Sequence, residues 1–389
     1  MKIIADENIQ ALESLISPLG ELTKLSPKSI NPQNLKKADA LIIRSVTSVI
    51  PSLIENSQIK FIGTTSVGFD NIDTNYLKQK NIYFTNAAGC NANSVVEYVL
   101  CSLLYLDSLN KISLKNSKIG IVGVGNIGSL LAKKLQALDI KVLLNDPLKE
   151  KTSPSLDLLP LEQLMDCDVI TLHVPLTHKE EYKTHLLFDK QMIRQMKKGS
   201  ILINTSRGEV VDTNALKKHL KSGHLSGAVL DVWPNEPHID TDLIPFLDIA
   251  TPHIAGHSYL GKRNGTVIIR NAFCRFFNLQ KPEDDFNKAG SQNLKTISIT
   301  KDINPNNFIS ELATITQKIY WPINDQKSLE KILNLTKKDH ASFFSSLRKN
   351  YPKRLEFSQT ILDLKTQLPD KEVLSKLKAL DFQINTSRE

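Results

Sequence analysis

The chain has 389 residues, of which 41% are hydrophobic and 23% are charged. This composition is typical of a folded globular protein and excludes a largely disordered chain. A single core rarely extends over so many residues, so two or three domains are expected. The formal net charge is +8, but the lysines are spread along the chain rather than gathered in one run, so we predict no nucleic-acid partner.

The four cysteines, at positions 90, 101, 167 and 274, lack the spacing of a metal site. So few cysteines indicate a reducing compartment, and we predict a cytoplasmic protein with reduced thiols and no bound metal. The opening "MKIIADENIQ" becomes acidic too early for a signal peptide. The most apolar segment, residues 94–107, carries Glu97 and is shorter than the roughly 20 residues of a membrane span. It predicts a buried helix, and no membrane partner is expected.

The first 95 residues alternate short β-rich runs such as "KIIAD", "ADALIIRS" and "IKFIGTTS" with helical patterns. This alternation predicts a parallel sheet covered by helices. Ligands of such sheets bind beyond the carboxyl ends of the strands. The polar residues that follow two of the strands, Arg44, Ser45 and Ser66, are therefore candidate substrate contacts, the alternative being plain turn residues.

A second alternating region begins with "SKIGIVGVGNIGSLLAKKLQALDIKVLLNDP". It predicts a strand over 117–122, a helix over 126–138 and a strand over 140–145. Further strands follow at "DVITLHV", "SILINTS", "GAVLDV" and "DIATP". The pattern is that of one doubly wound domain.

The predicted fold class is α/β, with two doubly wound parallel-sheet domains and a small C-terminal α+β module. Residues 1–95 with a returning helical segment, 258–284, form the predicted substrate domain. Residues 96–257 form the predicted Rossmann domain. The charged stretch "LQKPEDDFNKAG" indicates a linker, after which the pattern changes over residues 285–389.

The run "GVGNIG" supplies Gly123, Gly125 and Gly128 in the G-x-G-x-x-G spacing, directly after a β-branched strand and at the start of a helix. In that context the first glycine permits a tight turn, the second lets the backbone approach a pyrophosphate, and the third allows close helix packing. The helix start, with Asn126 and Ile127, would face the phosphates.

The acid expected about 20 residues further on is Asp146, at the end of the second strand. Its carboxylate can bind both hydroxyls of the adenosine ribose and would repel a 2′-phosphate. We therefore predict NAD rather than NADP as the cofactor. The alternative is that Asp146 only starts a turn before Pro147.

Three later strand ends carry residues that suit alcohol oxidation: Arg207 in "INTSRGEVVD", Glu236 in "VLDVWPNEP" and His253 in "TPHIAG". A histidine can take the hydroxyl proton as hydride leaves C2. A carboxylate on its other ring nitrogen fixes the tautomer, and an arginine grips a substrate carboxylate with two hydrogen bonds. Each residue also has a purely structural interpretation: Arg207 as a surface cation, Glu236 as a solvated loop acid and His253 as a core histidine.

Together, "GVGNIG", Asp146, "NTSRGEVVD", "LDVWPNEP" and "TPHIAG" resemble, in order, the D-isomer-specific 2-hydroxyacid dehydrogenase family over most of residues 1–280. The resemblance implies that Arg207 is the substrate clamp, Glu236 the histidine partner and His253 the acid/base. It also implies cofactor contacts, several through the main chain, at Thr205, Ser206, Arg207, Asp231 and Gly256.

Within that family, "ADEN", "RSVT", "GCNANSVVEYV", "HIAGHSYLGK" and the tail stretch "FSSLRKNYPKRLEF" resemble members that oxidise a phosphorylated four-carbon 2-hydroxy acid in pyridoxal phosphate biosynthesis. The tail in such members resembles a dimerisation domain, so a homodimer is expected. The implied substrate is small and anionic.

The same resemblance implies substrate contacts at Ser45 and Ser66, one of them in place of an expected threonine, and at His257, where a tyrosine is expected. Arg44 is a candidate cation for the substrate phosphate. Arg348, in the tail, is a second candidate, reaching the phosphate from the partner subunit.

Two alternatives remain open from the sequence. The first is another dehydrogenase of the family, acting on phosphoglycerate or glycerate. The second belongs to another class: an NADH-sensing binding protein that keeps this fold for protein partners.

Overall fold

The computed structural model describes residues 1–150, 152–153, 155–179, 181–282, 294–364 and 369–385. The chain divides into two compact units. Unit 1 comprises Met1–Ala92 and His257–Gln292, and unit 2 comprises Asn93–Gly256 and Asn293–Glu389.

Unit 1 is built on a five-stranded parallel sheet in the order β2-β1-β3-β4-β5. This is a doubly wound order of the flavodoxin type. Its strands are β1 (Lys2–Asp6), β2 (Glu21–Leu25), β3 (Ala40–Ile43), β4 (Phe61–Thr64) and β5 (Tyr83–Asn86). Its helices before residue 92 are short: α1 (Leu12–Leu15), α2 (Pro32–Leu35), α3 (Pro51–Ile54) and α4 (Thr74–Gln79), with 3-10 turns at Ser17–Leu19 and Pro27–Ser29.

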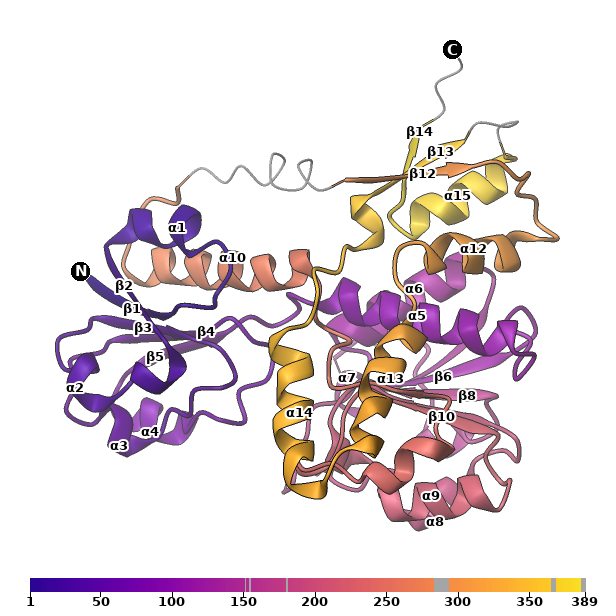
Figure 1. The fold of residues 1–389 in the computed structure, drawn as a ribbon, viewed down its shortest axis with the longest axis horizontal. Coiled ribbons are helices and arrows are strands. Elements are labelled where there is room, and N and C mark those ends of the chain that lie inside the picture. Colours follow the sequence, from indigo (N-terminus) through magenta and orange to yellow (C-terminus); the bar gives the residue numbers. More distant parts are fainter. Residues whose placement is uncertain (151, 154, 180, 283–293, 365–368, 386–389) are drawn as a thin grey trace. The chain divides into compact units, whose positions relative to one another are not determined.

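A long helix, α10 (Tyr259–Phe276), returns to this sheet late in the chain (Figure 1). Its buried face, with Ile269 and Phe273, shares a core with Ile3 and Phe61. Gly63 in β4 allows the close approach, because a Cβ atom there would lie 2.6 Å from the Cγ2 atom of Ile269. The alternation predicted for the first 95 residues is thus completed by a helix from beyond residue 257.

Unit 2 is built on a six-stranded parallel sheet in the order β11-β10-β9-β8-β6-β7. From β6 the chain adds β7 on one side of the sheet and then β8 to β11 on the other, so the strand order reverses between β6 and β8. Doubly wound sheets bind nucleotides at such a point. The strands are β6 (Lys118–Val122), β7 (Lys141–Asn145), β8 (Val169–Leu172), β9 (Ile201–Asn204), β10 (Gly227–Leu230) and β11 (Ile249–Ala250). The helices are α5 (Ala92–Ser108), α6 (Asn126–Ala137), α7 (Pro147–Glu150), α8 (Lys190–Gln195) and α9 (Thr213–Lys221), with 3-10 turns at Leu161–Leu164, Gly208–Val210 and Thr241–Phe246.

The residues after 293 add a three-stranded parallel sheet, β12-β13-β14, and several helices to unit 2 (Figure 1). The strands are β12 (Lys295–Ile299), β13 (Thr360–Leu364) and β14 (Gln383–Asn385). The helices are α12 (Phe308–Gln317), α13 (Pro322–Glu330), α14 (Lys337–Lys349) and α15 (Lys371–Ala379), with 3-10 turns at Lys331–Asn334 and Phe357–Gln359. The predicted fold class, two doubly wound sheets and a small C-terminal sheet, is confirmed.

The tail, residues 294–364 and 369–385, packs on the rest of unit 2 at two places. Ile297 and Phe357 join the core around α5 and α6, and Leu329 and Phe344 join the core around Trp233. Helix α13 packs on β11, and α14 packs on α13. The tail therefore shares hydrophobic cores with residues 93–256 of its own chain. Its predicted role in dimerisation stays a prediction.

Candidate active site

Six parallel strands end at one edge of the unit 2 sheet, and almost every predicted catalytic or cofactor residue follows one of them. The residues, in chain order, are Gly123 after β6, Asp146 after β7, Arg207 after β9, Asp231 and Glu236 after β10, and His253 after β11. Since β9, β10 and β11 are neighbours in the sheet, the predicted catalytic residues Arg207, Glu236 and His253 leave from adjacent strand ends.

The glycine-rich turn has the geometry that its spacing predicts. Gly123 has a φ of +89°, and a Cβ atom there would lie 2.6 Å from the carbonyl oxygen of His173. A Cβ atom on Gly128 would lie 2.0 Å from the carbonyl oxygen of Gly123. At Gly125, by contrast, the position of a Cβ atom is open, with nothing within 4 Å, directly before the exposed Asn126 at the start of α6. Two glycines are required by backbone packing, and the third leaves room for a pyrophosphate at a helix N-terminus.

Asp146 follows β7 and braces this turn from the neighbouring strand end. Its Oδ2 atom accepts a hydrogen bond from the backbone N–H of Val124 at 2.9 Å, and its Oδ1 atom accepts one from Lys149 at 3.1 Å. A carboxylate has about four lone-pair sites, so these two bonds leave acceptor capacity for ribose hydroxyls. The turn and its acid fit a dinucleotide without a 2′-phosphate.

The segment Thr205–Ser206–Arg207 forms a tight turn after β9. The Oδ1 atom of Asn204 accepts hydrogen bonds from the backbone N–H and the hydroxyl of Ser206, at 3.0 and 2.8 Å, and its amide donates to the carbonyl of Arg207 at 2.8 Å. Gly208 lies against the next strand end, where a Cβ atom would be 2.0 Å from the carbonyl carbon of Trp233. The Asn204 side chain and the close packing at Gly208 therefore fix the place of the Arg207 backbone.

Glu236 and His253 form a hydrogen-bonded pair. The Nδ1 atom of His253 lies 2.7 Å from Oε2 of Glu236, and Oε1 of Glu236 accepts the backbone N–H of Trp233 at 3.0 Å. Burial raises the pKa of Glu236, but the charge and hydrogen bond of His253, the charge of Arg348 and the Trp233 N–H outweigh it, so the pKa is lowered. The Glu236 side chain is 16% exposed and the His253 side chain is 32% exposed, so the imidazole is accessible to a reactant.

His253 is held in an unusual backbone conformation. Its φ is +56°, a left-handed value that is uncommon outside glycine. The carbonyl oxygen of Asp231 accepts its N–H at 2.7 Å, and the Asp231 carboxylate accepts the N–H groups of Ile254 and Ala255 at 2.8 and 2.9 Å. The hydroxyl of Thr251 donates to the same carboxylate at 2.7 Å. Asp231 is 1% exposed, and it acts here as a buried brace of the histidine turn. The cofactor contact predicted for it, and for Gly256 at the end of this turn, stays a prediction.

Arg348 lies in α14 of the same chain, with Nη1 3.5 Å from Oε2 of Glu236. The sequence predicts it as a phosphate ligand that reaches across from a partner subunit. In the structure its nearest acidic partner is the carboxylate that also binds His253. Its contact with the substrate phosphate stays a prediction.

Sequence reasoning missed His173, which follows β8 beside the glycine-rich turn. Its Nε2 atom lies 3.0 Å from the hydroxyl of Thr171 and its Nδ1 atom 3.3 Å from that of Thr205. Burial lowers the pKa of the imidazole to about 3, so it is neutral near pH 7. The available signal was its place directly after the strand run "DVITL", at the point where the winding reverses.

The predicted substrate residues Arg44, Ser45 and Ser66 lie together in unit 1, after β3 and β4. Arg44 binds the buried Asp6 through Nε and Nη2, at 2.9 and 3.2 Å. The Ser66 hydroxyl accepts the backbone N–H of Ser45 at 3.1 Å. Lys262, which the sequence did not single out, is a second cation, close enough to Arg44 to interact with its charge. Burial, and after it the charge of Arg44, lowers the pKa of Lys262.

His257, the remaining predicted substrate residue, belongs to unit 1. It directly precedes Ser258, whose hydroxyl accepts the N–H of Gly261 at 2.8 Å and caps α10. Its position is therefore set by the start of that helix.

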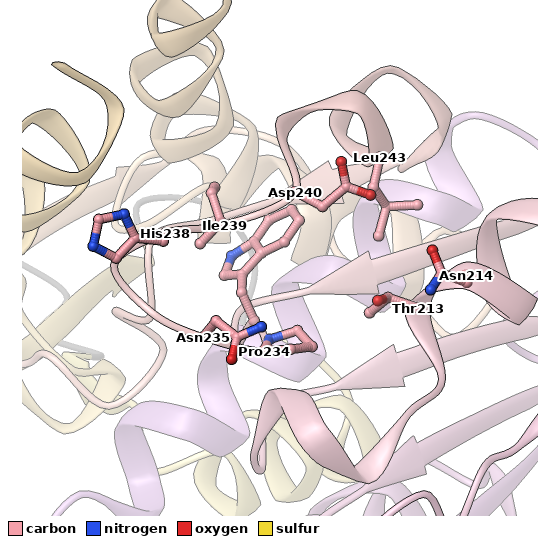
Figure 2. A pocket seen from close by; sticks show the side chains of 9 residues that line it. Thr213, Asn214, Pro234, Asn235, His238, Ile239, Asp240 and Leu243 are labelled. Carbon is pink, nitrogen blue, oxygen red and sulfur yellow. The ribbon is translucent and has the colours of Figure 1, made fainter. Parts of the chain in front are cut away.

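A hollow of about 340 Å³ lies beside the loop that carries Glu236 (Figure 2). Thr213 and Asn214 lie across it from His238. The full lining is Thr213, Asn214, Trp233, Pro234, Asn235, His238, Ile239, Asp240 and Leu243. None of the predicted site residues is among these side chains.

Within the described ranges, no helix is long and apolar enough to cross a membrane. The same part of the chain contains no cluster of three or more histidine, cysteine, aspartate or glutamate side chains arranged for a metal ion. The four cysteines, all within the described ranges, form no disulfide bond with one another.

Comparison with known proteins places this site in a family. Residues 105–255 match the family described as "D-isomer specific 2-hydroxyacid dehydrogenase, NAD binding domain". An erythronate-4-phosphate dehydrogenase of Wigglesworthia glossinidia brevipalpis is 42% identical over 373 residues, which are 93% of this chain and 94% of the relative. One of Bacteroides fragilis (strain YCH46) is 40% identical over 361 residues, 92% of this chain and 97% of the relative.

Among solved structures, an NAD-dependent formate dehydrogenase from Staphylococcus aureus in complex with NAD is 27% identical, with a TM-score of 0.58, covering 73% of this chain and 98% of its own. The chain therefore belongs to the D-isomer-specific 2-hydroxyacid dehydrogenase family, and residues 105–255 are its NAD-binding domain. The family and the cofactor predicted from the sequence are confirmed. The two erythronate-4-phosphate dehydrogenases match more than nine-tenths of the chain, so their match extends into the tail as well as over the two doubly wound sheets.

Proposed function

We propose that this chain oxidises 4-phospho-D-erythronate to (R)-3-hydroxy-2-oxo-4-phosphooxybutanoate, with reduction of NAD, in the biosynthesis of pyridoxal 5′-phosphate. One observation carries the proposal: relatives with that substrate in their name match more than nine-tenths of the chain. The Glu236–His253 pair at the NAD-binding edge of the sheet supports it.

The geometry gives His253 the role of proton acceptor. Since its Nδ1 atom is bound to Glu236, Nε2 is the nitrogen left to take the proton from the substrate hydroxyl. NAD bound at the glycine-rich turn supplies the acceptor for the hydride that leaves C2. Glu236 stabilises the imidazolium that forms, because its lowered pKa keeps it ionised.

Arg207 is the proposed clamp for the substrate carboxylate. A guanidinium binds a carboxylate through two parallel hydrogen bonds, and this orients C2. The rigid turn after β9, fixed by Asn204, would present the arginine in one position. Ser45, Ser66 and His257 are proposed as further polar contacts of the substrate.

The phosphate needs positive charge, and Arg44 is the proposed ligand. Its guanidinium already binds Asp6, so much of its charge is neutralised. Lys262 supplies additional positive charge beside Arg44, and we add it to the proposed phosphate contacts.

A panel assay tests the proposed substrate. NADH absorbance would be followed with 4-phosphoerythronate, unphosphorylated erythronate and 3-phosphoglycerate, each with NAD. We expect a kcat/KM for 4-phosphoerythronate at least a hundredfold above that for unphosphorylated erythronate, because a site built for a charged group discriminates strongly against its absence. We also expect it to exceed the kcat/KM for 3-phosphoglycerate, whose phosphate lies one carbon closer to the carboxylate. Equal rates on all three acids would reject the assignment, and a preference for 3-phosphoglycerate would favour the sister activity. Complete lack of turnover, with NADH-dependent association to a protein, would favour the sensor alternative.

A homodimer formed through the tail and a location in the cytoplasm are proposed alongside this activity. Light scattering coupled to size-exclusion chromatography measures the mass of the assembly directly. A mass of one chain at micromolar concentration would contradict the dimer.

A further inference from the structure

The carboxylate of Glu236 faces two cations from different parts of the chain. Its Oε2 atom lies 2.7 Å from Nδ1 of His253 and 3.5 Å from Nη1 of Arg348. Its Oε1 atom accepts the backbone N–H of Trp233. Both oxygens of Glu236 are thus occupied by groups of the protein, and one oxygen is shared between the histidine and the arginine.

The helix that carries Arg348 is anchored to the core of unit 2. Phe344 lies one turn earlier in α14, is 0% exposed and packs in the cluster that contains Trp233. Residues four apart lie on the same helix face, so the anchor points Arg348 toward the loop of Glu236. The Nε atom of Arg348 is buried and has no hydrogen-bond partner among the described residues. The guanidinium is therefore partly enclosed beside Glu236, with its side chain 31% exposed.

We propose that Arg348 is a positioning residue for the Glu236–His253 pair: it holds the carboxylate and weakens the affinity of the imidazole for a proton. This role of the tail in the chemistry rests on the proposed function, in which His253 is the base. A base must be unprotonated before it can act, so a nearby fixed cation would keep more of the enzyme in its active form at a given pH.

The sign of the effect follows from the charges. Protonated His253 and Arg348 both face the Oε2 atom of Glu236, at 2.7 and 3.5 Å, so the two like charges are close enough to repel each other. Loss of Arg348 removes this repulsion, and the imidazolium then no longer competes with a second cation for the Glu236 carboxylate. Both changes raise the pKa of His253. Asp231, after β10, and Arg207, after β9, are further charged groups at the ends of the two strands that come next to β11 in the sheet order. The carboxylate of Asp231 faces backbone N–H groups of the turn, and Arg207 lies on the turn after β9.

Titration of the full chain by NMR tests the inference without any turnover. The chain has nine histidines, and the imidazole signal of His253 is identified by its loss in His253→Gln. We expect Arg348→Gln to raise the pKa of His253 by about half a unit to one unit, the lower part of the range for a nearby charge because the arginine is partly exposed. Arg348→Lys should keep the charge and stay near the wild type. Lys338→Gln, the same loss of charge at an exposed site in α14, should leave the titration unchanged.

Two results would overturn the inference. One is a His253 titration in Arg348→Gln within 0.1 to 0.2 pH units of the wild type, roughly the smallest charge effect that a partly exposed pair can give. The other is an equal shift in Arg348→Gln and Arg348→Lys, since charge would then not be the cause.

The pH profile of kcat supplies a kinetic readout. Arg348→Gln should move the acidic limb to higher pH by the same interval, at saturating substrate. If Arg348 instead only binds the phosphate, KM for 4-phosphoerythronate rises, the acidic limb stays in place, and the inference is wrong. Should the wild type oxidise none of the three acids, the proposed function fails, whereas the NMR comparison still decides the role of Arg348.

Discussion

The Nδ1 atom of His253 lies 2.7 Å from Oε2 of Glu236, although the two residues follow different strands. Their strands, β11 and β10, are neighbours in the sheet, and Asp231 braces the turn that presents the histidine. The pair is therefore set before any substrate binds. Preorganisation of this kind places the cost of orienting the base in folding rather than in the reaction.

Replacing His253 by glutamine should lower kcat by about a hundredfold or more, the usual scale for loss of a positioned acid/base. Glu236→Gln should lower it at least roughly tenfold, because the amide no longer fixes the tautomer or stabilises the imidazolium. The affinity for NAD, measured by fluorescence titration, should stay within about twofold in both variants, since neither side chain lies at the glycine-rich turn. Near-normal turnover of His253→Gln would remove the histidine from this role.

Asp146→Asn should weaken NAD binding about tenfold or more, which corresponds to roughly 1.4 kcal/mol. The amide oxygen can still accept the N–H of Val124, so the turn should survive while the charged contact with the ribose is lost. The ratio of the dissociation constants for NADP and NAD should fall, because no carboxylate repels the 2′-phosphate. Isothermal titration calorimetry with both cofactors measures this. An unchanged ratio would show that Asp146 serves only the turn.

Lys262→Met should raise KM for 4-phosphoerythronate about tenfold, a typical loss for one charge-assisted hydrogen bond. The physical reason is that Arg44 shares its charge with Asp6, which leaves Lys262 as the stronger local attraction for a phosphate. KM for unphosphorylated erythronate should change little. Lys60→Met, at an exposed lysine of unit 1, is the matched control. A parallel rise of KM for both acids would argue against a phosphate contact.

The neutral His173 should make stability fall in acid. Its pKa is lowered by burial from 6.5 to about 3, so the folded chain binds fewer protons than the unfolded chain between those values. The stability from the neutral imidazole is present above pH 6.5 and is lost progressively as the pH falls toward 3. Relative to the wild type, His173→Gln should therefore gain about 2 to 3 kcal/mol between pH 7 and pH 4.5. Urea unfolding of both proteins at the two pH values measures this change. The prediction is wrong if the free energies of unfolding of variant and wild type differ by the same amount at pH 7 and pH 4.5.

Local patterns predicted much of unit 2 because they depend on neighbours in the chain. The expected helix over 126–138 is observed at Asn126–Ala137, and the strand expected over 140–145 is observed at Lys141–Asn145. The glycine spacing was enough to predict the turn, since φ at Gly123 and the contact of Gly128 are local requirements. Arg207, Glu236 and His253 were likewise proposed from their positions at strand ends together with their chemistry.

Position at a strand end alone does not predict the direction in which a side chain points; the pairing of Glu236 with His253 was expected from their chemistry and from the family resemblance. Asp231 and Glu236 are both acids after β10, yet one faces backbone N–H groups and the other faces His253. The choice depends on the path of the turn after β11, which the sequence of β10 does not contain. The place of Arg348 depends on packing between segments more than 100 residues apart, and no local pattern carries that information.

A last prediction concerns Arg354, through which the tail holds the histidine turn. This arginine is 5% exposed, donates to the carbonyls of Ala255 and Ser94 at 3.1 and 2.6 Å, and stacks 3.7 Å from the centre of the Tyr320 ring. Arg354→Met keeps much of the volume but removes the donors, so the carbonyl of Ser94 loses this charged partner in the interior.

Loss of a charged, buried donor should cost about 2 to 4 kcal/mol in the free energy of unfolding. The substitution should also lower kcat, because the carbonyl of Ala255 belongs to the turn that carries His253 and loses its bond to Arg354. The hydroxyl of Ser94 still donates to that carbonyl at 2.8 Å, so part of the support remains. Lys338→Gln, exposed in α14, serves as the control for a charge lost elsewhere in the tail. Urea unfolding and steady-state kinetics of the full chain measure both effects. Wild-type stability in Arg354→Met would mean that the turn depends on Asp231 and Ser94 alone, because the brace from the tail would then contribute nothing.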